Sequence, residues 1–495
     1  MELKDKKATV VGLARSGVGA ANLLASLGAS VVVTDMRSES ELAAATARLD
    51  PSVKRALGGH PEELFMSADL LVVSPGVPLD IAPIRTARSN GIPVISELEL
   101  AFQVLSGSRQ DSRDAIQFLA VTGSNGKSTT TTLLDDMLRR GGACTVLGGN
   151  IGNALTEEIL KMREDRDTSE GKYKNEKGKY KNKSGRACSE KDFVVAEVSS
   201  FQLEAIDAFR PRIASILNIT PDHMDRYHSL QEYAAAKAGI FLKQGEGDFL
   251  VINADDPETV RTVDEFLSGR RDKPELYYFS RTKAVRGVYC KDGALWCDMP
   301  HMQDYAGTIR LAAAGDILIK GVHNLENAMA ASVMALLAKC PLSAVTESMK
   351  TFPGLEHRLE FVRELDGVRY VNDSKGTNVG AVEKSIESFT EPLILIAGGR
   401  DKAGDFAKLR KQVAERVKAL VLIGEASGKI NDAVGDVTDT SFAGTLQEAV
   451  EISRSKAVKG DAVLLSPACA SFDMFLDFED RGRQFKKIVM GFGKK

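Results

Sequence analysis

Residues 120–134 read AVTGSNGKSTTTTLL and join a short apolar strand, a glycine-rich turn and the start of a helix. Such a turn points backbone N–H groups and a helix N-terminus at phosphate oxygens. Lys127 adds a positive charge, and the Ser128 hydroxyl can reach a bound Mg²⁺. Val121 stands where the usual GxxxxGK[ST] pattern has its first glycine, so the loop starts at Gly123. We expect this loop to bind a nucleoside triphosphate; the alternative is an ordinary glycine-rich turn. The residues expected at the phosphates are Gly123, Ser124, Asn125, Gly126, Lys127, Ser128 and Thr129.

Short apolar strands alternate with helical stretches on both sides of this loop, which predicts parallel sheets covered by helices. The 495 residues, at roughly 150 per domain, correspond to about three domains. A polar, turn-rich stretch at 106–114 and the Phe352-Pro353-Gly354 turn separate three such series. We therefore predict an α/β protein of three domains. These are a Rossmann-like domain at 1–108, a P-loop-type ATP-binding domain at 109–353 and a second Rossmann-like domain at 354–495.

Composition excludes several classes of protein. The 65 Lys and Arg residues nearly balance the 68 Asp and Glu residues, which argues against a dedicated nucleic-acid binder. No apolar run approaches the roughly 18 residues of a membrane span, and no signal-peptide core follows the N-terminus. Six dispersed cysteines without a C-x-x-C pair predict reduced thiols. We expect a cytoplasmic protein with small-molecule partners and neither a nucleic-acid nor a membrane partner.

The segment 161–191 breaks the α/β alternation. It is dense in Lys, Glu, Asp, Ser and Gly and contains the near-repeat GKYKNEK, GKYKNKS. Because it lacks the apolar residues that a core needs, we expect a mobile surface insertion with no part in the chemistry. The alternative is a basic loop that touches an acidic partner.

Near the N-terminus, Gly12, Gly17 and Gly19 lie between a strand and a helix, and Asp35 ends the next strand. This spacing is similar to a dinucleotide-binding fingerprint. Ala14, however, replaces the glycine that lets the backbone approach a pyrophosphate. A nucleotide diphosphate docked differently, or a purely structural turn, is therefore favoured over a nicotinamide cofactor.

Charged residues follow two strands of the second series. Glu197 is the last residue of the strand FVVAE. His223 and Asp225 lie in the segment NITPDHMDRYHS, which follows another strand. The carboxyl ends of parallel strands face the ligand crevice, so Glu197 and His223 are candidate Mg²⁺ ligands near the triphosphate. The alternative for Glu197 is a structural acid. Lys237, in the helical run QEYAAAKAGIFL, reads by itself as a surface lysine.

Three strands of the third series are followed by polar segments: NDSKGTN (372–378), GGRDKAGD (398–405) and LSPACASFDMF (465–475). They supply cationic and hydroxyl groups suited to binding carboxylates. These groups are Lys375, Thr377, Lys402 and Ser471. The alternative is a set of ordinary polar turns at strand ends.

Taken together, TGSNGKST, EVSSFQLE, NITPDHMDRYHS, the helix with Lys237, GVHNLENAMAA, PGLEHRLE, NDSKGTN and LSPACASFDMF resemble the Mur ligase family in order and spacing. The resemblance covers nearly the whole chain. Within the family, the third-domain segments resemble the branch that adds D-glutamate to UDP-N-acetylmuramoyl-L-alanine. Folylpolyglutamate synthases share the ATP loop but differ in the third domain. An NAD-dependent oxidoreductase would leave GSNGKST unexplained, and a non-catalytic nucleotide switch would not need the other motifs.

The resemblance implies ATP-dependent amide-bond synthesis in cytoplasmic peptidoglycan assembly, with two Mg²⁺ ions. It implies that Lys127, Glu197, His223 and Lys237 are catalytic, and that Ser128 and Glu197 bind the first Mg²⁺ and His223 the second. It also implies that Lys237 is carbamylated and that its carbamate oxygens bind the second Mg²⁺ together with His223. Further ATP contacts would be Asn324, Asn327, Arg358 and Asp373. Contacts to the UDP-sugar substrate would be Ser16, Asp35, Arg37, Ser74, Pro75, Gly76, Asn150 and Ser199. Contacts to D-glutamate would be Lys375, Thr377, Lys402, Ser471, Phe472 and Phe478.

Overall fold

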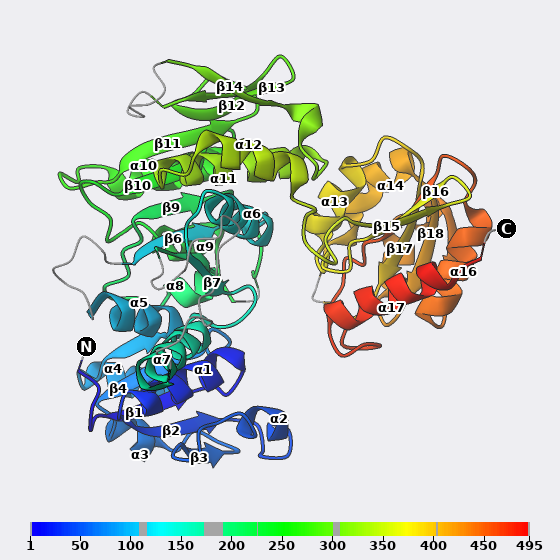
Figure 1. The fold of residues 1–495 in the computed structure, drawn as a ribbon. Coiled ribbons are helices and arrows are strands. Elements are labelled where there is room, and N and C mark those ends of the chain that lie inside the picture. The colour runs from blue at the N-terminus through cyan, green and yellow to red at the C-terminus, as the bar shows by residue number, and fades with distance from the viewer. Residues whose placement is uncertain are drawn as a thin grey trace. The chain divides into compact units, whose positions relative to one another are not determined.

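The computed structural model describes residues 2–107, 116–172, 192–224, 226–299, 307–401 and 404–493, with only the backbone at 164–172. Three sheets with flanking helices make up this part of the chain (Figure 1). The α/β prediction with three sheet-containing regions is therefore confirmed. The chain forms two compact units: Met1–Ile317 with Glu326–Thr351, and Leu318–Leu325 with Phe352–Lys495. The first unit contains two of the three sheets.

The first sheet is parallel throughout, in the order β3-β2-β1-β4-β5. Its strands are β1 (Lys7–Val11), β2 (Ser30–Asp35), β3 (Lys54–Leu57), β4 (Leu70–Val73) and β5 (Val94–Ser96). Its helices are α1 (Arg15–Ser26), α2 (Ala43–Thr46), α3 (Glu62–Met66), α4 (Ala82–Ser89) and α5 (Glu97–Gly107). The central strands β1 and β4 are nearly continuous apolar runs, as expected for a parallel sheet covered on both faces.

The second sheet has the order β14-β13-β12-β11-β10-β9-β6-β8-β7, and only its β12–β14 end is antiparallel. Its strands are β6 (Gln117–Thr122), β7 (Thr145–Gly149), β8 (Phe193–Glu197), β9 (Ile213–Ile216), β10 (Phe249–Asn253), β11 (Glu275–Ser280), β12 (Gly287–Lys291), β13 (Ala294–Asp298) and β14 (Ile309–Ala313). The helices of this region are α6 (Lys127–Arg140), α7 (Leu155–Lys172), α8 (Ser200–Leu203), α9 (Leu230–Ala238), α10 (Pro257–Leu267), η1 (Ala314–Asp316), α11 (Val322–Leu337) and α12 (Leu342–Thr351). The strand β6 lies between β8 and β9, so the loop that follows it starts at the end of an inner strand of the sheet.

The third sheet, in the second unit, has the order β15-β16-β20-β17-β18-β19, with only β15 antiparallel. Its strands are β15 (Glu360–Leu365), β16 (Val368–Asn372), β17 (Leu393–Gly398), β18 (Val417–Ile423), β19 (Asp439–Phe442) and β20 (Ala462–Leu465). Its helices are α13 (Val379–Glu387), η2 (Phe406–Leu409), α14 (Arg410–Arg416), α15 (Ser427–Val434), η3 (Gly435–Val437), α16 (Leu446–Lys456) and α17 (Phe478–Gly491). Separate apolar clusters pack α13–α15 and α16–α17 against this sheet.

Two buried glutamates join the first sheet to the second. Glu99, in α5, accepts hydrogen bonds from the backbone N–H groups of residues 207, 208 and 209, each at 2.9 Å. Glu97 accepts from the backbone N–H (2.7 Å) and hydroxyl (2.8 Å) of Thr156 at the start of α7. These contacts explain why two sheets share one compact unit despite the polar stretch at 106–114.

Two expectations need correction. The first residues of the 161–191 segment are not a loop, because α7 continues through them to Lys172. Apolar residues at helical spacing, Leu155, Ile159 and Met162, anchor this helix to the core, and the Arg, Glu and Lys residues among those that follow are good helix formers. Residues 173–191 lie outside the described part. Cys144 is disulfide-bonded, whereas Cys290, Cys297, Cys340 and Cys469 are free thiols as expected. The dispersed cysteine spacing carried no signal for that bond.

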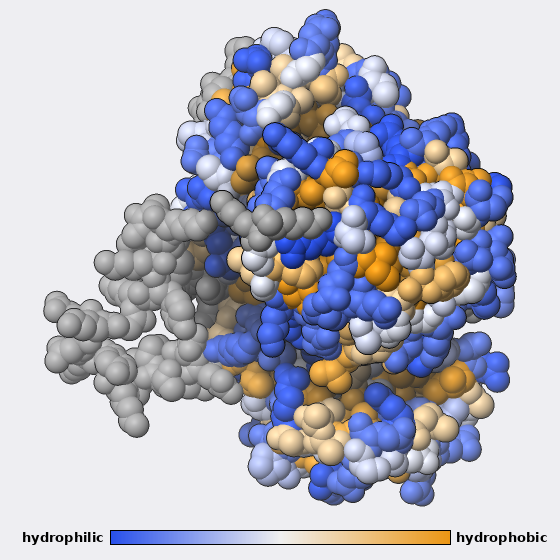
Figure 2. Space-filling model, turned by 90° about the vertical axis from the view of Figure 1, so that its right-hand side faces the viewer, coloured by the Kyte–Doolittle hydropathy of each residue, from blue (hydrophilic) through white to orange (hydrophobic). Residues whose placement is uncertain are grey.

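The hydropathy of the described surface agrees with the sequence, which has no long apolar run. Figure 2 shows a face that is mainly hydrophilic, with hydrophobic residues interspersed. No helix among the described residues is long and apolar enough to cross a membrane.

Candidate active site

The phosphate loop forms the turn between β6 and α6, as predicted. Gly126 is the N-cap of α6 with φ of 88°, and a Cβ atom there would overlap the Asn327 side chain, so only glycine fits. Lys127 is half-buried, and its ammonium donates hydrogen bonds to the carbonyls of Gly123 (2.7 Å) and Ser124 (2.9 Å). Lys127 is therefore not an exposed loop cation, because it is the first residue of α6 and its side chain folds back over the turn.

The residues after β9 hold this loop in place. The backbone N–H of Asn125 donates to Asn218 Oδ1 (2.8 Å), and the Asn218 amide donates to the Asn125 carbonyl (3.1 Å). The Ser124 hydroxyl donates to the Thr220 carbonyl at 2.8 Å. Ser128 and Thr129 are buried in the first turn of α6. The loop is therefore preorganised by its neighbours.

Lys237 is not a surface lysine, since it is only 1 % exposed. It lies in α9, and its ammonium donates to the Gly123 carbonyl at 3.0 Å, the same oxygen that Lys127 contacts. Its Nζ lies 4.4 Å from the centre of the Tyr233 ring. Burial lowers the pKa of Lys237 well below its ordinary value, and the charge of Lys127 lowers it further. The site thus favours the neutral amine, the form that can react with CO₂.

Glu197 lies at the carboxyl end of β8, where β8 pairs with β6 opposite Val121. Its side chain is buried, and Oε1 accepts a hydrogen bond of 2.6 Å from the Asn150 amide. Its other oxygen, Oε2, is buried without a hydrogen-bond partner among the described residues. A buried carboxylate oxygen with spare acceptor capacity is a suitable ligand for a hard cation such as Mg²⁺.

His223 follows β9 in a left-handed conformation (φ 55°) with 47 % of its side chain exposed. Its ring packs edge-on against Phe201 at 4.8 Å between centroids, and its Nε2 lies 3.8 Å from Asp222 Oδ2. Within the described ranges, neither His223 nor Glu197 belongs to a cluster of three metal-binding side chains. Asp225 lies outside the described residues.

At the end of β2 in the first sheet, the Asp35 carboxylate is hydrogen-bonded to neighbouring residues. It accepts hydrogen bonds from the Leu13 amide (2.7 Å) and from both Nε (3.0 Å) and an Nη (2.8 Å) of Arg37. Burial alone would raise the pKa of Asp35, but these hydrogen bonds outweigh it and lower the value to about 2. A Cβ atom at Gly17 would overlap the Gly12 carbonyl, so this glycine serves strand–helix packing. Gly17 and Asp35 thus both have local structural roles at this turn.

The remaining predicted contacts to the UDP-sugar come from three places: the turn after β4, the N-cap of α8 and the first turn of α1. The Ser74 hydroxyl, after β4, donates to the Gly12 carbonyl (2.7 Å), which ties the two strand-end loops together. The Pro75 carbonyl accepts from Arg226 (2.9 Å). Ser199 caps α8 through reciprocal hydrogen bonds with Gln202. Ser16 lies in the first turn of α1, and Gly76 lies in the turn after β4.

Predicted ATP contacts fall in both compact units, Asn327 in the first and Asn324, Arg358 and Asp373 in the second. Asn327 accepts from the Thr130 hydroxyl at 3.2 Å. Asp373 is buried and accepts from the hydroxyls of Ser385 (2.7 Å) and Ser466 (2.6 Å). Burial raises the pKa of Asp373, against the lowering effect of these hydrogen bonds.

The predicted D-glutamate residues of the second unit lie in the segments after β16 and β20. The ammonium of Lys375 lies 5.7 Å from the centre of the Phe478 ring. Ser471 is buried, whereas Phe472 is 61 % exposed; Thr377 is half-buried. Lys402 lies outside the described residues.

Sequence analysis missed Arg481, in α17. Its side chain is fully buried and donates to the hydroxyl and the carbonyl of Ser374, each at 2.9 Å. Burial lowers its pKa to about 10. Through these hydrogen bonds, Arg481 fixes Ser374 near the start of the NDSKGTN segment. An arginine in a helix carries no local signal of burial, because it is usually an exposed residue.

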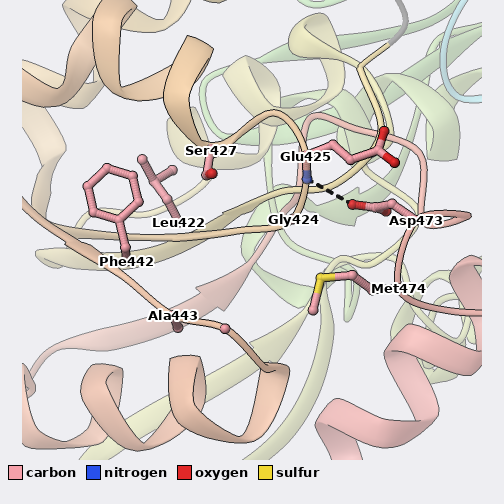
Figure 3. Close-up of a pocket in the computed structure, with 9 residues that line it drawn as sticks. Leu422, Gly424, Glu425, Ser427, Phe442, Ala443, Asp473 and Met474 are labelled. Atoms are coloured by element: carbon pink, nitrogen blue, oxygen red, sulfur yellow. Dashed lines mark hydrogen bonds between the residues drawn. The ribbon is translucent and has the colours of Figure 1, made fainter.

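A pocket of about 520 Å³ also escaped prediction. It lies beside the ends of β18 and β19, where the Glu425 amide donates to Asp473 Oδ2 at 3.0 Å (Figure 3). Phe442 and Met474 contribute apolar walls. None of the predicted site residues lines this pocket.

Comparisons with known proteins agree along the chain. Residues 6–96 match the Mur ligase MurD-like N-terminal domain, residues 121–335 the Mur ligase middle domain, and residues 357–469 the Mur ligase glutamate ligase domain. The UDP-N-acetylmuramoylalanine–D-glutamate ligase of Citrifermentans bemidjiense is 44 % identical over 100 % of this chain and 99 % of its own. The enzyme of the same name from Pelotomaculum thermopropionicum is 41 % identical over 99 % of this chain and 100 % of its own.

Solved structures share the fold. The UDP-N-acetylmuramate-alanine ligase MurC of Thermotoga maritima superposes with a TM-score of 0.56 at 19 % identity, covering 98 % of this chain and 99 % of its own. MurF of Acinetobacter baumannii gives 0.55 at 15 % identity, covering 94 % and 86 %. The family models match most of the sequence and relatives above 40 % identity align from end to end, so the chain belongs to the Mur ligase family.

Proposed function

We propose that this protein is an ATP-dependent ligase that joins D-glutamate to UDP-N-acetylmuramoyl-L-alanine in peptidoglycan synthesis, in the cytoplasm. The observation that carries the proposal is that relatives of one name, UDP-N-acetylmuramoylalanine–D-glutamate ligase, align with the whole chain at 41–44 % identity. A preorganised phosphate loop next to a buried acid and a buried lysine supports the same chemistry.

The reaction needs ATP because a carboxylate is a poor electrophile. A carboxylate oxygen of the sugar-nucleotide attacks the γ-phosphorus of ATP, and ADP leaves with the electron pair of the broken P–O bond. The amine of D-glutamate then attacks the acyl carbon and loses a proton, and the tetrahedral intermediate expels phosphate as the amide forms. Lys127 and the amides at the start of α6 would stabilise the charge on the transferred phosphoryl group.

The donor set at the loop fits Mg²⁺. Ser128 and Glu197 would hold one ion and His223 a second, and the unpartnered Glu197 Oε2 is the observation that favours this assignment. Bound there, Mg²⁺ would neutralise phosphate charge. Asn150 would orient Glu197 through its 2.6 Å hydrogen bond to Oε1.

Lys237 is proposed to carry a carbamate. Its neutral Nζ attacks the carbon of CO₂, the new N–C bond forms, and one proton passes from the nitrogen to solvent. The product is a negatively charged carbamate, which replaces an amine that can otherwise be protonated to an ammonium. The burial and the lowered pKa of Lys237 support the proposal because both favour the neutral amine.

The second unit would bind the amino acid. Lys375, Thr377, Lys402, Ser471, Phe472 and Phe478 are the proposed contacts. Lysine and hydroxyl groups match the two carboxylates of glutamate, because charge-assisted hydrogen bonds are the strong ones. Arg481 would hold the Ser374 backbone, and with it the segment that contains Lys375 and Thr377.

ADP release tests the proposal. The purified protein is mixed with ATP, Mg²⁺ and UDP-N-acetylmuramoyl-L-alanine, and D-glutamate, L-glutamate, L-alanine or no amino acid is added. We expect turnover only with D-glutamate. Turnover with L-glutamate and a folate acceptor instead would favour a folylpolyglutamate-synthase-like activity. Continuous ADP release at the same rate with and without an amino acid would count against ligation.

A further inference from the structure

Arg358 lies in a backbone segment of unusual conformation. The residues on either side of it, His357 (φ 63°) and Leu359 (φ 45°), are both left-handed although neither is glycine. Side chains with a Cβ rarely adopt this conformation, and they keep it only where surrounding contacts enforce it. The direction of the Arg358 side chain therefore depends on whatever holds residues 356–360.

Carboxylates hold both sides of this segment. The backbone N–H of His357 donates to Glu360 Oε2 at 2.9 Å, and the N–H of Leu359 donates to Asp373 Oδ1 at 3.2 Å. The His357 carbonyl accepts from the N–H of Lys375 at 3.0 Å. The segment is thus fixed through its main chain, and Glu360 is the acid nearest to the left-handed His357.

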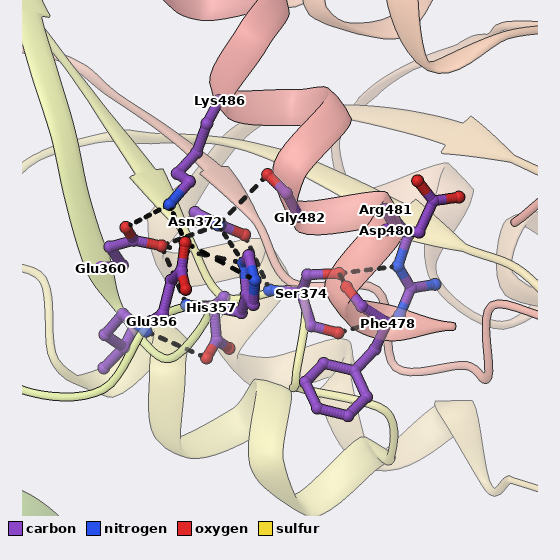
Figure 4. Close-up of polar contacts among 12 residues, drawn as sticks. Glu356, His357, Glu360, Asn372, Ser374, Phe478, Asp480, Arg481, Gly482 and Lys486 are labelled. Carbon is purple, nitrogen blue, oxygen red and sulfur yellow. Dashed lines mark hydrogen bonds and ion pairs between the residues drawn. The ribbon is translucent and has the colours of Figure 1, made fainter. Parts of the chain in front are cut away.

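Glu360 is in turn fixed from α17, near the C-terminus. Lys486 donates to Glu360 Oε1 at 2.9 Å and also pairs with Glu356 (Figure 4). Asn372 donates to Glu360 Oε2 at 3.0 Å and contacts His357 Nδ1 at 2.9 Å. Lys486 is therefore the link between α17 and the two acids of the segment.

The packing around this network leaves little room for rearrangement. His357 is buried, and a Cβ atom at Gly482 of α17 would overlap its ring. Glu356, His357 and Glu360 offer ligand atoms within 4.8 Å of one another, a spacing that would suit a metal ion. The ammonium of Lys486 already pairs with both of these acids, so the cluster has its own internal cation.

We propose that Lys486 is a positioning residue for ATP use: through Glu360 it holds the left-handed segment that aims Arg358. The inference rests on the proposed function, in which Arg358 contacts ATP. It assigns a role in nucleotide binding to a residue of the last helix that sequence analysis did not single out.

The test compares Lys486→Met with Lys487→Met, a matched control at the next, exposed position of the same helix. Steady-state ADP release is measured with ATP varied and the other substrates saturating. We expect Lys486→Met to raise the KM for ATP about tenfold, the effect of losing a hydrogen bond to a charged group, while the KM for D-glutamate changes much less. Lys486→Arg should restore most of the loss, and Lys487→Met should match the parent.

Arg358→Ala and the double variant with Lys486→Met distinguish the ATP contact of Arg358 from the positioning of Arg358 by Lys486. If Lys486 acts through Arg358, its substitution adds little to the KM for ATP once Arg358 is gone. An unchanged KM for ATP in Arg358→Ala would remove the proposed role of Arg358 itself. A raised KM in Arg358→Ala with no effect of Lys486→Met, or with multiplying effects in the double variant, would overturn the inference alone. Circular dichroism checks folding, and Glu360→Gln replaces Lys486→Met in the cycle if the latter does not fold.

Discussion

Replacing Lys127 by Met removes the charge that would act on the transferred phosphoryl group while keeping the length of the side chain. In the structure, the ammonium makes two hydrogen bonds, to the carbonyls of Gly123 and Ser124. The Gly123 carbonyl still accepts from Lys237 in the variant, so only one of these acceptors loses its lysine donor. We expect a stability loss of about 1 kcal/mol, the net contribution of one hydrogen bond.

The expected loss of activity is much larger. Removing one preorganised group that stabilises transition-state charge costs roughly 10²- to 10³-fold in rate, or about 2.7–4 kcal/mol of barrier. The effect should fall on kcat at saturating ATP, because the charge develops during phosphoryl transfer. Because burial is the larger cause of the lowered Lys237 pKa, the carbamate proposed there should survive the loss of the Lys127 charge.

The measurement is ADP release at saturating substrates, with thermal unfolding and ATP binding recorded on the same preparations. Lys243→Met is the control, since Lys243 is an exposed lysine of the same unit. We expect a folded Lys127→Met protein with turnover at least a hundredfold below the parent. Turnover within threefold of the parent at saturating ATP would refute the assignment of this loop.

Three further predictions follow from buried groups. Protein equilibrated with ¹³C-bicarbonate should show one carbamate resonance. The Lys237→Ala variant should lack this resonance and should lose most of the ligase activity; a resonance that survives the substitution would contradict the assignment. Burial raises the pKa of Glu97, so the folded state binds more protons than the unfolded state above the ordinary pKa of 4.5, and stability should fall as the pH rises from there through the raised value. Glu97→Gln should flatten that fall in melting temperature, and an unchanged slope would count against it. Glu99→Ala leaves the N–H groups of residues 207–209 without their acceptor and should destabilise the first unit by about 3 kcal/mol, with faster hydrogen exchange at those three amides.

Strands with a continuous apolar run were predictable, and the charged edge strands β3 and β15 were not. The runs at β1, β6, β8, β17 and β20 are buried on both faces, so composition alone marks them. The edge strand β3 (KRAL) begins with two exposed charges, and three of the six residues of β15 (EFVREL) are charged. Edge strands carry charges that discourage pairing with other chains, and these charges hide them from a search for hydrophobic runs.

The same contrast applies to the candidate site. The phosphate loop was predictable because its residues are consecutive and their geometry is local. The buried Lys237 donates a hydrogen bond to Gly123, 114 positions away, and its helix has no pronounced apolar face that would mark it. The pairing of Glu360 with Lys486 spans 126 positions. Such contacts follow from the packing of whole elements, and the family resemblance was the only sequence signal for Lys237.

The polar stretch at 106–114 illustrates how a correct local reading leads to an incomplete picture of the whole. It predicts a break between two domains, and the two sheets do lie on either side of it. Yet Glu97 and Glu99, a few residues earlier, bind main-chain groups of the second sheet region and hold both sheets in one compact unit. Under the proposed function, the sugar-nucleotide site and the phosphate loop would then belong to one unit, so the attacking carboxylate and the phosphates of ATP would be positioned by a single framework. Two buried acids on one helix turn would thus contribute to the first chemical step by fixing the relation between two binding sites.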